Sequence, residues 1–218
     1  MEASQLERYE AARPPRSLLA ALSADPAHAA EHVALAAAQR HGPAAAAWLA
    51  QRRTFYADEP RALARMAVKR HVNLARLTGA ATGVGGILNA IPDLLAQAWI
   101  QSRMVFFIAA AHGLDPHDPM RPAEYLVIEG LYRDPPAARR ALDGVGPGLA
   151  MAYAGSRLAR EEKLYRTLAR LTGRTAGKRL GRSIPGFAIA ANSVGDARQA
   201  KALGRRAIEF YGRFRPGG

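Results

Sequence analysis

The chain has 218 residues, no cysteine and a formal net charge of +13 at pH 7. A hydrophobic fraction of 49% is that of a globular protein with a sizeable core, and it excludes an intrinsically disordered chain. The absence of cysteine excludes disulfides, thiolate metal sites and cysteine nucleophiles, and it fits a reducing compartment. Residues 1–17 are charged and lack an apolar segment, so we expect no secretory signal.

The positive charge is concentrated towards the C-terminus. Residues 157–215 hold 15 Lys/Arg against 4 Asp/Glu, a net charge of +11, which leaves +2 for the rest of the chain. This asymmetry suggests an anionic partner, such as a membrane surface or a membrane protein, and a merely solvated basic surface is an equally open interpretation. Basic residues are not interleaved with base-stacking aromatic residues, which disfavours nucleic acid as the partner.

Helical patterns begin near the N-terminus. The pieces 26–40 and 43–53 are rich in alanine and have proline near their starts, so they predict two successive helices. Residues 59–78 repeat apolar positions with the helical period, and Gly79 predicts the end of that helix.

Further helices are predicted in the rest of the chain. A long helix is expected over 92–112, with Pro92 at its start and Gly113 at its end. Shorter helices are expected over 122–132, 157–172 and 196–211. Alternating runs of β-branched residues are lacking, so strands should be scarce.

The most apolar stretch, 80–102, contains several polar residues. One aspartate at the centre of a membrane span costs roughly 2.5–3.5 kcal/mol, and Asp93 lies near the middle of this stretch. A simple single span is therefore disfavoured. A buried helical hairpin, or one that dips into a membrane surface, remains open.

Two segments of the chain resemble each other. "NAIPD" at 89–93 matches "NSVGD" at 192–196, and "LARLTG" occurs at both 74–79 and 168–173. The pattern predicts an all-α helical bundle built from two internally repeated halves, each with a Gly-rich apolar helical hairpin. Such halves commonly pack about a pseudo-two-fold axis, which would bring the two N-x-x-x-D segments together.

Two longer segments carry a resemblance to a known family. They are "TGAATGVGGILNAIPDLLAQAWIQSRMVFFIAAAHGLDP" (78–116) and "IPGFAIAANSVGDARQAKALGRRAIEFYGR" (184–213). Their order and composition resemble the EcsC protein family. The resemblance implies a bacterial, helical, membrane-associated protein with an accessory role in transport or secretion, and it supplies no catalytic residues. We expect an N-terminal helical extension over 1–58 followed by an EcsC-like helical domain over 59–218.

The repeated segments also supply candidate ligand-binding residues. Residues four apart share a helix face, so the first segment predicts a polar stripe that faces a counterpart from the second segment. Arginines close to both stripes could pair with a diphosphate. The candidates are Asn89, Asp93, Gln97, Gln101, Arg103, Asn192, Asp196, Arg198 and Gln199.

A structural interpretation of the same residues is favoured over the ligand hypothesis. Asp93 would lie in the first turn of a helix after Pro92, where its negative charge favours the helix dipole. Ser193-x-x-Asp196 is close to a capping box. The remaining polar residues would form hydrogen bonds between helices.

Two main functions follow from these patterns. The first, which rests on the charge asymmetry and the family resemblance, is a cytoplasmic protein peripheral to the inner face of the membrane. It would act there through a basic face and an apolar Gly-rich core, as an accessory of transport or secretion, and need no cofactor. The alternative is a terpene-cyclase-like, Mg²⁺-dependent enzyme or carrier for an isoprenoid or lipid diphosphate, with Asp93, Asp196 and Asn192 as metal ligands. The chain lacks a D-D-x-x-D cluster, which weighs against that alternative. A third hypothesis is a purely structural interaction module, and whether the protein is an enzyme stays open.

One short motif suggests a metal site. "HAAEH" at 28–32 matches H-x-x-E-H, a pattern of zinc peptidases. The match is five residues long and no third ligand follows it. We therefore favour the surface face of an Ala-rich helix.

Overall fold

A computed structural model describes residues 13–56, 59–82, 90–145, 167–168 and 185–214. Within these residues the chain forms seven α-helices, one short 3-10 helix and no strand, which confirms the predicted all-α class. The Gly-rich segments on which the predicted repeat depends lie largely outside the described residues. So does most of the helix expected over 157–172, and both stay predictions.

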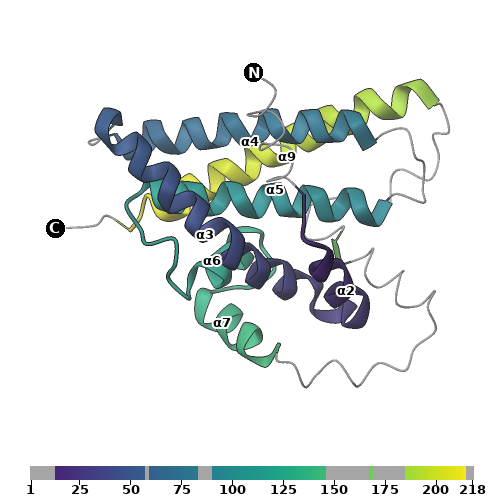
Figure 1. Ribbon diagram of the computed structural model, residues 1–218, viewed down its shortest axis with the longest axis horizontal. Helices are drawn as coiled ribbons and strands as arrows, with labels where there is room; N and C mark the ends of the chain where they lie inside the picture. Colours follow the sequence, from purple (N-terminus) through teal and green to yellow (C-terminus); the bar gives the residue numbers. More distant parts are fainter. Residues whose placement is uncertain (1–12, 57–58, 83–89, 146–166, 169–184, 215–218) are drawn as a thin grey trace.

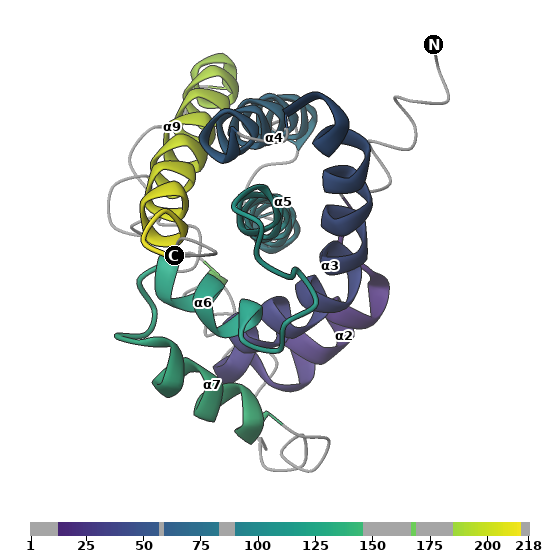
Figure 2. The same ribbon diagram turned by 90° about the vertical axis from the view of Figure 1, so that its left-hand side faces the viewer.

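Within the described residues, the helical elements follow one another in chain order. Their bounds are α2 Arg16–Ala24, η1 Pro26–His28, α3 Ala29–Tyr56, α4 Pro60–Thr82, α5 Ala90–Ala111, α6 Arg121–Ile128, α7 Pro135–Gly144 and α9 Pro185–Tyr211. Helices α4, α5 and α9 run side by side along the longest axis of the molecule, and α3 crosses them obliquely (Figure 1). Viewed along that axis, α5 lies at the centre, surrounded by α3, α4, α6 and α9 (Figure 2). Helices α2 and α7 pack on the outside of α3 and α6.

The core is built around α5. Its aromatic residues Trp99, Phe106 and Phe107 are almost fully buried, and Tyr125 of α6 and Tyr211 of α9 pack into the same core. Burial of a side chain of this size stabilises the fold by roughly 2–3 kcal/mol. Within the described residues, one stretch of 18 residues in α5 is long and apolar enough to cross a membrane by composition, and 89% of it is buried in the bundle. A buried core helix has the same composition.

Two glycines end helices as left-handed residues. Gly113 has a φ of 79° and follows α5, which confirms the predicted end of that helix. Its N–H donates to the Ala110 carbonyl at 2.9 Å. Gly130 has a φ of 82° and follows α6, which therefore ends before residue 132. Glycine adopts this conformation without the steric cost that a Cβ imposes.

The two helices predicted over 26–40 and 43–53 are one continuous helix, α3. Pro43 lies inside α3 instead of beginning a second helix. A proline in a helix interior costs about 3 kcal/mol, and the packing of α3 against α5 offsets that cost. The preceding Gly42 is tightly covered, because a Cβ there would lie 2.9 Å from the Pro116 carbonyl oxygen.

Helix α4 also extends beyond its predicted end. It continues through Gly79 to Thr82, so that glycine does not end it. Helix α5 begins at Ala90, before Pro92, and Asp93 remains within its first four residues.

The last helix, α9, begins at Pro185, eleven residues before the predicted start at 196. Ser193 and Asp196 therefore lie inside α9, and the predicted capping box is wrong. Intrinsic helix propensities are weak, so a capping pattern by itself does not fix where a helix begins, and beyond Asp196 the residues Ala197 and Ala200 of α9 pack against Val72 of α4.

Helix α7 has a clear local signal that the sequence analysis did not use. The Asp134 carboxylate accepts a hydrogen bond from the Ala137 N–H at 2.8 Å, and Pro135 follows as the first helical residue. An aspartate cap followed by proline is a typical helix start.

Candidate functional site

The polar stripe predicted on α5 meets α9 at one position. The Gln97 Nε2 donates to the Gln199 Oε1 at 3.0 Å. Gln97 is buried, and Gln199 lies 102 residues further along the chain. This contact agrees with the expected hydrogen bonds between helices.

The other candidates have different surroundings. Gln101 is buried on α5, and its Oε1 has no hydrogen-bond partner among the described residues. Arg103 is half-buried, with its guanidinium carbon 5.1 Å from the centre of the Phe107 ring. Arg198 is exposed on α9. Asn89 lies outside the described residues, as do the side chains of Asp93, Asn192 and Asp196.

The metal hypothesis therefore stays a prediction. Within the described residues, no group of three or more His, Asp or Glu side chains could hold a metal ion. The H-x-x-E-H motif has a different arrangement. The rings of His28 and His32 donate to the Asp25 carboxylate, at 2.9 Å and 3.2 Å to Oδ2. Glu31 is buried and accepts a hydrogen bond from the Tyr132 hydroxyl.

Two buried histidines on neighbouring helices were missed from the sequence. The His41 ring of α3 lies 4.3 Å from the Trp99 ring, and the His71 ring of α4 lies 5.0 Å from the Phe107 ring. The His71 Nδ1–H donates to the Ala67 carbonyl at 2.8 Å, while the Nε2 atoms of both histidines have no hydrogen-bond partner among the described residues.

The surroundings lower the pKa of both rings. Burial, together with the positive charges of Arg103 and Arg70, lowers the pKa of His71 from 6.5 to about 3, against the hydrogen bond with the Ala67 carbonyl, which raises it. Burial and the same arginine lower the pKa of His41. Burial also lowers the pKa of Arg103 to about 10, together with the charges of Arg40 and Arg70. A proton on either histidine would be a further positive charge in this cluster.

A buried carboxyl group lies between α6 and α9. Burial raises the pKa of Glu129 from 4.5 to about 8, although Arg206 and a hydrogen bond with Tyr125 lower it. The Arg206 Nη2 lies 3.8 Å from the Glu129 Oε2. Glu129 directly follows α6 and faces Arg206 of α9, so its ionisation is expected to weaken the contact of α6 with α9.

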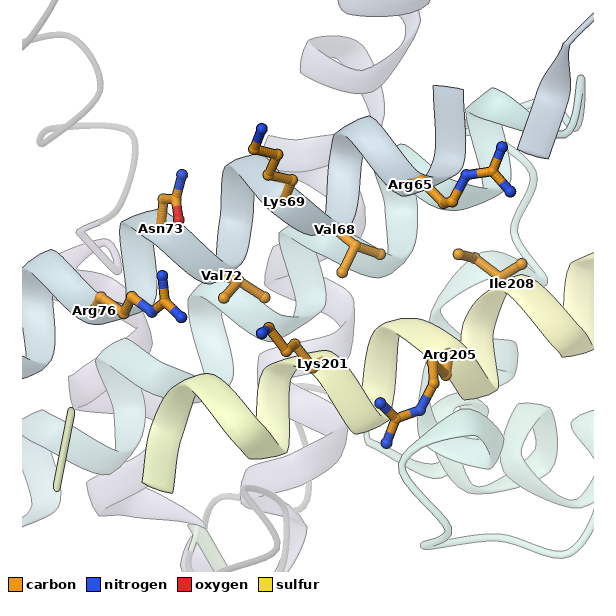
Figure 3. Close-up of a pocket in the computed structure, with 9 residues that line it drawn as sticks. All are labelled: Arg65, Val68, Lys69, Val72, Asn73, Arg76, Lys201, Arg205 and Ile208. Carbon is orange, nitrogen blue, oxygen red and sulfur yellow. The ribbon is translucent and has the colours of Figure 1, made fainter. Parts of the chain in front are cut away.

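A groove lies between α4 and α9, and we call it the basic groove. It has a volume of about 420 Å³. Its cations are exposed, three from α4 and two from α9, and its apolar residues lie between the two helices (Figure 3). In the part of the chain that the structure describes, no acidic residue lines it. The lining residues are Arg65, Val68, Lys69, Val72, Asn73, Arg76, Lys201, Arg205 and Ile208.

The basic groove combines two parts of the sequence that differ in net charge. The cations of α9 belong to the basic segment 157–215, whereas those of α4 lie in the nearly neutral remainder. A spacing signal exists in α4, because Arg65, Lys69 and Arg76 fall on one side of a helix. Only the packing of α9 against α4 turns two basic stripes into one groove.

Comparison with known proteins gives one match. The sequence model of the EcsC protein family matches residues 36–215 of the 218-residue chain. The match therefore begins inside α3 and includes α4, α5 and α9. No curated protein and no solved structure shows a significant match to the chain.

Proposed function

Because the chain belongs to the EcsC protein family, we propose that it acts at the cytoplasmic face of the membrane, where its basic groove binds anionic lipid headgroups. The observation that carries this proposal is the gathering of five exposed cations along one groove. The cytoplasmic leaflet is anionic, so this face would turn towards it.

The expected strength of such binding follows from the charges. A lysine or arginine near an anionic membrane surface contributes about 1 kcal/mol at physiological ionic strength. Five of them support reversible attachment that weakens as salt is added. We propose that such attachment serves an accessory role beside a membrane protein of transport or secretion.

The apolar residues of the groove add a second contribution. Val68 and Ile208 are half-buried, and they lie among the cations that line the groove. A surface that presents cations around apolar side chains is typical of proteins that lie at a membrane interface. A purely acidic protein partner would use the cations and leave the apolar residues unpaired.

Vesicle co-sedimentation tests this proposal. The protein should bind vesicles that contain both phosphatidylglycerol and phosphatidylcholine at low salt, and it should dissociate from them at high salt. It should not bind vesicles of phosphatidylcholine alone. The double variant Lys201→Glu/Arg205→Glu should lose at least tenfold in apparent affinity. The matched control is Arg133→Glu/Arg140→Glu, with the same change of charge on exposed residues away from the groove, and it should lose less than threefold. Equal binding to both kinds of vesicle, or equal losses in both variants, would refute the proposal.

A further inference from the structure

The basic groove has two different ends. At one end, Arg76 of α4 and Lys201 of α9 extend towards each other on either side of Val72 (Figure 3). From there the apolar floor continues along the groove through Val68 to Ile208 (Figure 3). The charged ends of the other three cations, Arg65, Lys69 and Arg205, point outward from this floor.

The floor is formed by tight packing of the two helices. Gly204 of α9 lies so close to Val68 that a Cβ would be 2.7 Å from the Val68 Cγ2. Val72 is buried against Ala197 and Ala200 of α9. Because small residues let α4 and α9 approach closely here, the floor exists before any ligand binds.

A paired cationic end followed by an apolar floor has the chemistry of one class of ligand. A phosphate group accepts hydrogen bonds from a guanidinium and an ammonium group together, and these are strong charge-assisted bonds. Val68 and Ile208 are half-buried and present no polar side-chain atom, so an aliphatic chain fits against them, while the buried Val72 closes the floor beside the two cations. The volume of about 420 Å³ lies within the range of small-molecule sites.

Building on the proposed function, we propose that the basic groove holds a single anionic phospholipid. The lipid phosphate lies between Arg76 and Lys201, and one acyl chain follows the floor past Val72 and Val68 to Ile208. The three outward cations contact neighbouring headgroups of the membrane. The groove thus recognises one lipid molecule, and the surrounding charges attach the protein to the surface.

A water-soluble lipid separates this inference from membrane attachment. Titration calorimetry uses dihexanoyl phosphatidic acid below its micelle concentration and the full-length protein. Dihexanoyl phosphatidylcholine has the same chains without net charge, and glycerol 3-phosphate has the phosphate without chains. We expect phosphatidic acid to bind at least tenfold more tightly than either. Equal affinity for glycerol 3-phosphate would refute the acyl-chain site, and equal affinity for phosphatidylcholine would refute the phosphate site.

Variants assign the two ends of the groove. Arg76→Gln/Lys201→Gln should lower the affinity for dihexanoyl phosphatidic acid at least tenfold. Arg133→Gln/Arg140→Gln should change this affinity less than twofold. Ile208→Ser shortens the apolar floor. We expect it to lower the affinity for dihexanoyl phosphatidic acid at least threefold and to leave the affinity for glycerol 3-phosphate unchanged. Thermal unfolding followed by circular dichroism checks that each variant is folded. An unchanged affinity in folded Arg76→Gln/Lys201→Gln protein would overturn the inference.

The two proposals fail in different ways. Binding to anionic vesicles without binding of the short-chain lipid would overturn the single-lipid site and leave membrane attachment standing. Binding of the short-chain lipid without binding to vesicles would overturn membrane attachment and support the lipid site.

Discussion

The basic groove and the interior around α5 both contain polar side chains, which are exposed to solvent in the groove and buried in the interior. In the groove, cations such as Lys201 and Arg205 are exposed to solvent between two helices. In the interior, His41, His71 and Gln97 are almost fully enclosed by aromatic and aliphatic side chains. Helix α9 belongs to both regions, because Gln199 bonds inward while Lys201 lines the groove.

Because of this difference in exposure, we expect the groove residues to affect ligand binding and the interior residues to affect the stability of the fold. An exposed cation retains its hydration, so its substitution changes the unfolding free energy by less than about 0.5 kcal/mol and leaves its charge available for a ligand. A buried polar group has lost its hydration, so its protonation or removal changes the stability of the bundle. We therefore expect substitutions of the groove cations to alter binding alone, and the following experiments test the interior.

The largest effect is expected at Glu129. Its pKa is about 8 in the folded protein and 4.5 in the reference state, so the folded protein keeps a proton that the unfolded chain loses. The stability that this group provides is complete below pH 4.5 and is lost as the pH rises to about 8. At about 1.4 kcal/mol for each pKa unit, the loss is at most about 5 kcal/mol. Glu129→Gln should remove this dependence and gain stability over the native protein between pH 5 and pH 8.5.

Urea unfolding at both pH values measures the effect. The control is Glu209→Gln, at an exposed position of α9, which should follow the pH profile of the native protein. Parallel profiles of Glu129→Gln and the native protein would show that Glu129 ionises as easily in the folded state as in the unfolded one.

The next largest effect is expected at His71, where stability is lost as the pH falls rather than as it rises. His71 has a pKa of about 3 in the folded state against 6.5 for the reference, so the unfolded chain takes up the proton first as the pH falls. Protonation therefore lowers stability progressively from about pH 6.5 to pH 3, by about 2 kcal/mol at pH 5 for this residue alone. Asparagine keeps a donor for the Ala67 carbonyl and cannot be protonated in this range.

His71→Asn should thus reduce the loss of stability between pH 7.5 and pH 5, measured by urea unfolding. The comparison uses the change with pH within each protein, because the lost packing against Phe107 lowers both values equally. An unchanged slope would mean that His71 accepts a proton inside the fold, next to Arg103.

A smaller effect is expected where α4 and α9 touch below the groove. Gly204→Ala would place a Cβ 2.7 Å from the Val68 Cγ2, and overpacking of this kind costs about 1–3 kcal/mol. Val68→Ala in the same chain should recover part of that loss. Gly144→Ala on α7 has open space around its Cβ and should leave the melting temperature nearly unchanged. A neutral Gly204→Ala would show that the two helices separate easily.

The smallest effect concerns the Gln97–Gln199 hydrogen bond. Gln97→Leu should lower the unfolding free energy by about 1 kcal/mol, because leucine has no donor to replace the hydrogen bond from the Gln97 Nε2 to the Gln199 Oε1. A double-mutant cycle with Gln199→Leu should give a coupling energy of about 0.5–1.5 kcal/mol. Additive single effects would show that the bond does not contribute to the contact between α5 and α9.

The outcome at individual residues shows what could be predicted. Gly113 was predicted to end α5, because a left-handed residue after an apolar helix is a local requirement. Gln97 was placed on a polar face that meets α9, because side chains four residues apart share a helix face. Pro43 and Asp196 were misplaced, since local signals favoured helix starts at positions that lie inside the long helices α3 and α9.

The sequence by itself therefore determined the all-α class, most of the helices, the family and the positive charge of the chain. These properties depend on residue spacing and composition, which act locally. The tertiary structure alone decided that the pKa values of His41 and His71 are lowered, that the pKa of Glu129 is raised, and that the basic stripes of α4 and α9 form one groove. Each of these depends on which helices pack together, because burial and the distance between charges set the energy of a polar group.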